Sequence, residues 1–226
     1  MLKTYKSELE ELIEKLRKSE VDVVISGDPF NKNKSFMVSL YTENLTIETE
    51  RVAGSGSITI EIIFTGLKGT HIAVPKLFGK DTLRAMQYGL LLTDGSVHKK
   101  GYPQMNMNQT WQVFTWLLAW PGRNHVHIYG VGINGNDVGI AWNLMAIDHK
   151  GEFESKAVVA EEVNKLDDDG FPLFLLFAIL SDGSVNVEKS KIVNLYIGKT
   201  KREIWGGNII ERLRSSGLER GMRSVE

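Results

Sequence analysis

Residues 87–97 read QYGLLLTDGSV and residues 175–185 read LLFAILSDGSV, so a largely apolar run is twice followed by the same four residues. Apolar runs that end in Asp-Gly predict two buried helices, each ending at one acid, Asp94 or Asp182. If these helices pack side by side about a pseudo-twofold axis, the two aspartates meet at the rim of a dry interface. Carboxylates are costly there unless a divalent cation binds them. The repeat therefore predicts a paired-acid metal site.

The order of elements after each motif also repeats. Asp94 and Asp182 are offset by 88 residues, and Gln109-Thr110 lies opposite Lys199-Thr200 at an offset of 90. This offset keeps the apolar positions of the following strand on one face, as a duplicated strand requires. We predict a domain over 81–226, with copy one at 81–166 and copy two at 170–226, and copy two lacks its final hairpin.

Local patterns predict a mixed α+β protein. Residues 1–80 form a β-rich N-terminal region, with a helix over 5–18 and strands over 21–26, 35–42, 46–52 and 57–65. Copy one is predicted to contain helices 82–94, 110–120 and 156–166, short strands 95–100 and 104–108, and a hairpin of 125–133 with 138–147. Copy two is predicted to contain a helix ending at Asp182, strands 185–188 and 192–198, and a helix over 200–214.

The two runs ending at Asp94-Gly95 and Asp182-Gly183 resemble degenerate motifs of the LAGLIDADG homing endonuclease family, and the likeness covers about residues 80–215. Some stretches also resemble proteins of archaeal mobile elements. The family resemblance implies a pseudo-twofold αββαββα repeat that binds double-stranded DNA in its major groove and cuts it with Mg²⁺. It implies Asp94 and Asp182 as metal ligands and catalytic residues, with Gln109 and Lys199 assisting the attacking water.

The same resemblance implies that the outward face of the strands reads DNA. Amide and imidazole side chains there would pair with base edges, and cationic ones would hold phosphates. The expected base-reading residues are Gln104, Asn106, Asn108, His125, His127, Tyr129, Asn194 and Tyr196. The expected phosphate-binding residues are Lys99, Lys100, Arg123, Lys189, Lys191, Lys201 and Arg202.

Composition limits the alternatives. The net charge of −1 (27 basic minus 28 acidic residues) is low for a nucleic-acid partner, and no cysteine is present to form a disulfide or a thiolate metal site. No segment reaches the roughly 18 consecutive apolar residues of a membrane span, and a cytoplasmic monomer with internal pseudo-symmetry is expected. One hypothesis for the truncated second copy is that the hairpin of 46–52 and 57–65 packs onto it and replaces its missing strands.

Other interpretations remain for the same residues. Asp94 and Asp182 could simply end helices before glycines, although an acid meets the unfavourable end of the helix dipole there. His125 and His127 share a strand face and could bind a metal or form a polar surface, and Trp111, Trp116 and Trp120 are predicted to pack in a core. At the level of function, a Mg²⁺-dependent DNA endonuclease is the first hypothesis. The alternatives are a non-cleaving DNA- or RNA-binding protein, such as a maturase, regulator or inactive element remnant, and an interaction module.

Overall fold

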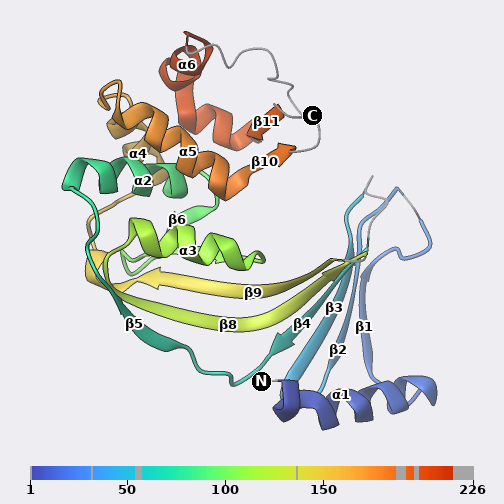
Figure 1. Ribbon diagram of the computed structural model, residues 1–226. Coiled ribbons are helices and arrows are strands. Elements are labelled where there is room, and N and C mark those ends of the chain that lie inside the picture. Colours follow the sequence, from blue (N-terminus) through green and yellow to red (C-terminus); the bar gives the residue numbers. More distant parts are fainter. Residues whose placement is uncertain are drawn as a thin grey trace. The chain divides into compact units, whose positions relative to one another are not determined.

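A computed structural model describes residues 2–31, 33–53, 58–135, 137–186, 192–195 and 199–215, with side chains for 5–31, 33–53, 58–135, 137–183 and 203–215. It confirms a mixed α+β protein (Figure 1). The chain forms two compact units. Unit 1 comprises Met1–Gly69, Asn108–Thr110 and His127–Trp142, and unit 2 comprises Thr70–Met107, Trp111–Val126 and Asn143–Glu226.

Unit 1 is an antiparallel sheet with one helix. Its own elements are α1 (Leu2–Arg17), β1 (Val23–Gly27), β2 (Phe36–Tyr41), β3 (Leu45–Arg51) and β4 (Thr59–Phe64). Each of these strands pairs with the next, and β4 pairs with the later strand β8. Tyr5 of α1 packs on Phe64 with ring centroids 4.7 Å apart, and Leu45 lies in the same buried cluster. The amphipathic stripe of α1 therefore covers one end of this sheet.

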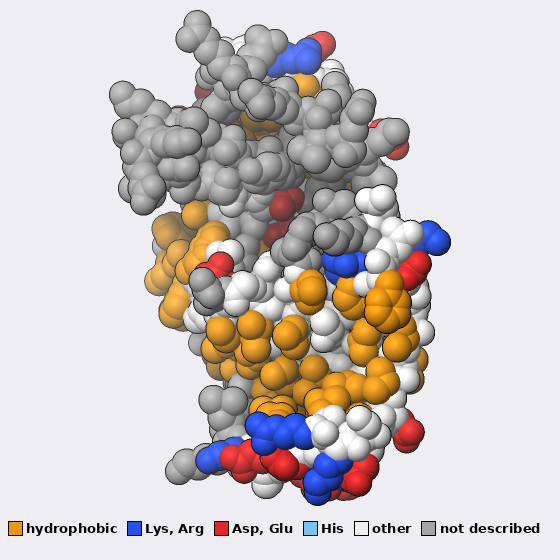
Figure 2. Space-filling model, turned by 90° about the vertical axis from the view of Figure 1, so that its right-hand side faces the viewer, with side chains coloured by type: hydrophobic (Ala, Val, Ile, Leu, Met, Phe, Trp, Pro, Cys, Tyr) orange, Lys and Arg blue, Asp and Glu red, His pale blue; other side chains and the backbone are white. Residues whose placement is uncertain are grey.

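The edge strand β1 is largely apolar and exposed. Val23, Val24 and Ile25 are 45%, 55% and 56% exposed, and Figure 2 shows a face on which apolar side chains gather.

On β3 and β4 the acids Glu48 and Glu61 are direct cross-strand partners. Burial raises the pKa of Glu61, and the charges of Glu48 and Glu50 add to this rise. Like charges placed directly opposite one another weaken a strand pair.

Unit 2 contains the two motif helices and the elements around them. These elements are β5 (Thr70–Val74), α2 (Lys80–Leu92), β6 (Gly95–Val97), β7 (Pro103–Met107), α3 (Thr110–Ala119), α4 (Lys156–Val163), α5 (Gly170–Asp182), β10 (Gly183–Asn186), β11 (Ile192–Leu195) and α6 (Lys199–Ser215), with a short 3-10 turn at Ile147–His149. Strands β8 (Gly122–Asn134) and β9 (Asp137–Ala146) contribute residues to both units. Within the described residues, nine strands form one sheet in the order β1-β2-β3-β4-β8-β9-β7-β6, with β5 also paired to β8. Strands β10 and β11 form a separate pair.

Three sequence predictions differ from the structure. The hypothesis that the N-terminal hairpin completes the second copy is wrong, because β4 pairs with β8, which lies in the predicted first copy. Strand β5 was not predicted and pairs along residues 122–126 of β8. Trp116 and Trp120 are fully buried as predicted, with ring centroids 5.0 Å apart, whereas Trp111 is 43% exposed.

Candidate functional site

The two motif helices, α2 and α5, lie side by side in unit 2 (Figure 1). Gly89 makes this approach possible, because a Cβ atom there would lie 2.4 Å from the Phe174 carbonyl oxygen and 2.8 Å from the Ala178 amide nitrogen. Such distances to backbone atoms exclude any larger residue without a shift of one helix. The predicted pairing of the two apolar helices is confirmed at this point of contact.

The seam between these helices is dry. Leu90 and Leu92 of α2 and Phe174 and Ala178 of α5 have no exposed surface. Apolar burial of this kind contributes roughly 25 cal/mol for each Å² removed from water. A polar group that reaches this seam must therefore have a hydrogen-bond partner.

The C-terminal ends of the two helices meet. The backbone N–H of Asp94 donates to Ser181 Oγ at 3.4 Å, and Ser181 is followed directly by Asp182. Asp94 is the second residue after α2 and is exposed, whereas Asp182 is the last residue of α5 and is half-buried. The two motif acids are thus anchored to helix ends that share a hydrogen bond.

Three donors from other helices satisfy the last carbonyls of α2 and α5. Lys156 Nζ donates to the Thr93 carbonyl at 2.6 Å, and Trp205 Nε1 donates to the Leu92 carbonyl at 3.2 Å. Gln112 Nε2 donates to the Ser181 carbonyl at 2.6 Å. Helix ends leave such carbonyls unpaired unless another group reaches them. Sequence reasoning missed these donors, although Gln112, a polar residue in the apolar pattern of α3, was a detectable signal.

The carboxylates of Asp94 and Asp182 have the donor chemistry that Mg²⁺ prefers. Among the residues that the structure describes, no group of three or more His, Asp or Glu side chains could hold a metal ion. Mg²⁺ does not require one, because it commonly binds one or two carboxylates and completes its shell with water and substrate phosphate. If these two acids hold a cation, the expected site is therefore a solvated one for a hard cation and not a closed structural site.

A row of polar pairs crosses the sheet of unit 2. Gln104 Nε2 on β7 donates to Ser96 Oγ on β6 at 3.2 Å. Asn143 Nδ2 on β9 donates to Asn106 Oδ1 on β7 at 2.7 Å. Gln104 and Asn106 were predicted, whereas Asn143 was missed because its position in a long strand carried no motif.

A separate polar pair joins β5 and β8. His71 lies directly opposite His125, and their ring centroids are 5.2 Å apart. His125 was a predicted residue, and His71 was missed together with its strand. On the same strand, the rings of His127 and Tyr129 are 6.4 Å apart and belong to unit 1.

Arg123, predicted to bind phosphate, is held by a carboxylate. Its side chain bonds to Asp148 Oδ1 at 2.8 Å, and its backbone N–H donates to Asp148 Oδ2 at 2.8 Å. The side-chain hydrogen bond from Arg123, with the backbone one, lowers the pKa of Asp148, and the same side-chain bond raises the pKa of Arg123. A phosphate would have to compete with Asp148 for this guanidinium.

The other predicted residues lie in several elements. Lys99 and Lys100 are exposed in the turn between β6 and β7, and Asn108 and Gln109 belong to unit 1. Lys199, Lys201 and Arg202 lie in the first turns of α6, and Asn194 lies opposite Ser184 in the β10–β11 pair, all without described side chains. Lys189, Lys191 and Tyr196 lie outside the described residues.

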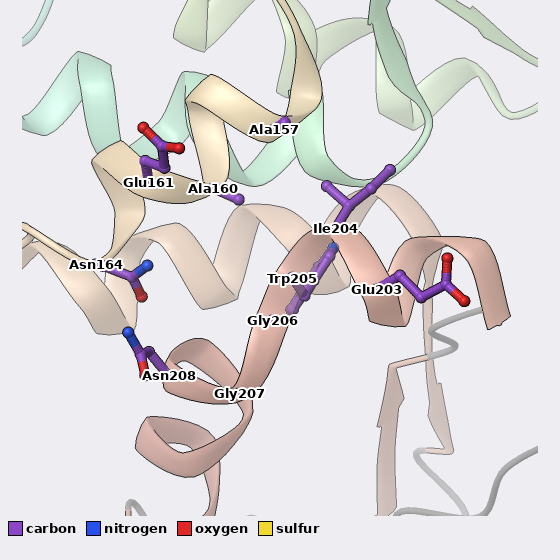
Figure 3. A pocket seen from close by; sticks show the side chains of 10 residues that line it. All are labelled: Ala157, Ala160, Glu161, Asn164, Glu203, Ile204, Trp205, Gly206, Gly207 and Asn208. Carbon is purple, nitrogen blue, oxygen red and sulfur yellow. The ribbon is translucent and has the colours of Figure 1, made fainter.

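A pocket of about 440 Å³ opens between α4 and α6, and neither motif acid is among its lining residues. Its walls are Ala157, Ala160, Glu161 and Asn164 from α4 and its end, and residues 203–208 of α6 (Figure 3). Helix α6 is kinked at Gly206, whose φ of 66° is a left-handed conformation that glycine adopts readily. In Figure 3 the amides of Asn164 and Asn208 point toward one another across the opening.

The comparisons with known proteins add no relative. No family model, no curated protein and no solved structure matches this chain. No helix in the described part of the chain is both long enough and apolar enough to cross a bilayer.

Proposed function

We propose that this protein is a Mg²⁺-dependent DNA endonuclease of the LAGLIDADG type, with a pseudo-twofold repeat built on α2 and α5. The observation that carries the proposal is the contact between the two helix ends, where the Asp94 N–H meets Ser181 Oγ one residue before Asp182. Two acids fixed at neighbouring helix C-termini stand at the unfavourable end of both dipoles. A bound cation would offset that cost, which gives the acids a reason to be there.

The polar row on the sheet of unit 2 supports DNA as the substrate. Asn106 and Asn143 present amide groups, which can pair with adenine in the major groove, and Gln104 presents another. Their mutual hydrogen bonds hold these groups in place before DNA binds. Such preorganisation reduces the entropy lost on binding.

In the proposed reaction each residue has a defined task. Asp94 and Asp182 would hold the cation through their carboxylates. A divalent cation, when bound, supplies Lewis acidity and a water of lowered pKa. Lys156, through the Thr93 carbonyl, and Gln112, through the Ser181 carbonyl, are positioning residues that fix the helix ends carrying the two acids.

The decisive experiment uses the full chain, supercoiled plasmid carrying a pool of random inserts, and Mg²⁺. The wild-type protein should nick or linearise a fraction of the plasmids, and EDTA should prevent this. Asp94→Asn should reduce the rate by at least about a hundredfold, because the loss of a cation ligand removes several kcal/mol of transition-state stabilisation.

Asp81→Asn is the matched control. Asp81 is an exposed acid in the first turn of the same helix, so its loss changes the charge of α2 but not its C-terminal end. Cutting that persists in Asp94→Asn, or is lost equally in Asp81→Asn, would contradict the proposal. Salt-dependent binding of DNA or RNA without cutting would instead support a non-cleaving binding protein on this scaffold, since counterion release marks phosphate contact.

A further inference from the structure

The pairing of β5 with β8 brings two imidazoles together outside the proposed catalytic site. His71 and His125 are direct cross-strand partners within a five-residue antiparallel ladder, from Thr70 opposite Val126 to Val74 opposite Gly122. Directly opposite residues project from the same face of the sheet. The backbone ladder thus fixes both imidazole stems on one face, independently of any motif.

The ring separation matches what a tetrahedral metal ion requires. A Zn–N bond is about 2.0–2.1 Å long, so two histidines on one tetrahedral ion place their ring centroids about 5 Å apart. In this protein the centroids of His71 and His125 are 5.2 Å apart, with the ring planes inclined at 49°. The rings are therefore neither stacked face to face nor too distant for one ion to bridge them.

The pair lies partly at the surface. His71 is exposed and His125 is half-buried. The next pair on the same face of the ladder is Ala73 opposite Arg123, and the charge of Arg123 is countered by Asp148 at 2.8 Å. A neighbouring cation would otherwise repel a metal ion, so this ion pair reduces the electrostatic cost of binding.

We propose that His71 and His125 form a binding site for a borderline transition-metal ion such as Zn²⁺, with water in the remaining coordination positions. Imidazole selects Zn²⁺, Ni²⁺ and Cu²⁺ over hard cations such as Mg²⁺. With only two protein ligands the ion exchanges with solvent, unlike the four-ligand sites that hold small domains together. Bound metal would cross-link β5 to β8 and stabilise that part of unit 2 by mass action.

Zinc titration of the full chain, prepared without a polyhistidine tag, tests this site. Calorimetry should show one Zn²⁺ bound per chain, and added Zn²⁺ should raise Tm in a manner that EDTA reverses. His71→Asn should weaken binding by at least about tenfold and remove the rise in Tm, because one of two ligands is lost. Circular dichroism of the metal-free variant checks that it folds, and His125→Asn should give the same loss of affinity.

Two controls make the test specific. His98→Asn changes a histidine in the turn after β6, outside the pair, and should leave Zn²⁺ affinity unchanged. Asp94→Asn should also retain it, so failure of the zinc site and failure of the proposed nuclease can be told apart. Absence of Zn²⁺ binding to the wild type, or equal binding by wild type and His71→Asn, would overturn the proposal.

Discussion

The same four residues, Asp-Gly-Ser-Val, occur at the C-terminal ends of α2 and α5, but different groups satisfy the last backbone carbonyls of each helix. At the end of α2, Thr93 turns its hydroxyl back to the Gly89 carbonyl at 2.8 Å, and the Thr93 carbonyl accepts from the charged Lys156. At the end of α5, Ser181 turns its hydroxyl to Asp94, and the Ser181 carbonyl accepts from the neutral Gln112. A duplicated sequence therefore specifies two matching helix ends, while the groups that complete each end come from elsewhere in the chain.

Both helix ends depend on the close packing of α2 against α5. Gly89 lies in this seam, so Gly89→Ala should have the largest effect on stability. The added methyl group would overlap the Phe174 carbonyl, and we expect the free energy of unfolding to fall by about 2–3 kcal/mol. Urea denaturation followed by circular dichroism measures this change.

Gly207→Ala is the matched control in α6. Nothing lies within 4 Å of a Cβ atom at this position. Gly207 follows the kink at Gly206, so alanine there should change the free energy of unfolding by less than about 0.5 kcal/mol. A large loss at Gly89 beside a near-neutral change at Gly207 would show that close packing requires Gly89. A neutral or stabilising Gly89→Ala would mean that the helices do not approach as described.

Gln112→Met distinguishes the end of α5 from that of α2 and should have an intermediate effect. The near-isosteric change leaves the Ser181 carbonyl without its donor, at a cost of about 1–2 kcal/mol. Gln104→Met serves as the control, because Gln104 is half-exposed and should change stability by less than about 0.5 kcal/mol. Equal effects of the two changes in urea denaturation would show that the α5 end needs no donor.

Lys156→Met probes the end of α2 and should have the smallest effect, a loss of about 0.5–1 kcal/mol. Lys156 is the first residue of α4, where the helix dipole disfavours a cation, yet its ammonium reaches the C-terminal carbonyl of Thr93, where a cation is favoured. Removing the ammonium loses the favourable interaction with the Thr93 carbonyl but also relieves the unfavourable one at the start of α4. Lys165→Met, which removes only a surface pair with Glu162, should cost less in the same assay, and a larger loss there would contradict this account.

Sequence patterns located most helices and strands because alternation and apolar runs report local burial. They failed where an element was short, or where it depended on contacts between residues far apart in the sequence. Strand β5 has only five residues between Gly69 and Pro75, too few for a clear alternation. Helix α2 ends at Leu92 and not at residue 94, since Thr93 adopts φ −103° and ψ −109°, which no helical period encodes.

The candidate site was predictable in part for the same reason. The repeated motif indicated that Asp94 and Asp182 end paired helices, and the helix pairing is confirmed. The donors to those ends could not be found, because Lys156, Gln112 and Trp205 lie 63, 69 and 113 residues from their acceptors. Alternation of apolar and polar residues also predicts a strand without identifying the strand that pairs with it. This is why the N-terminal hairpin was assigned to the wrong copy.

The long separation between Trp205 and Leu92 has a consequence for biosynthesis. Unit 2 cannot complete its packing until the ribosome has released residues 199–215, more than a hundred residues after α2 emerges. For most of that interval, until α5 follows, the apolar surface of α2 lacks its main packing partner and is prone to aggregate. A chaperone that shields nascent helices should therefore increase the yield of folded protein.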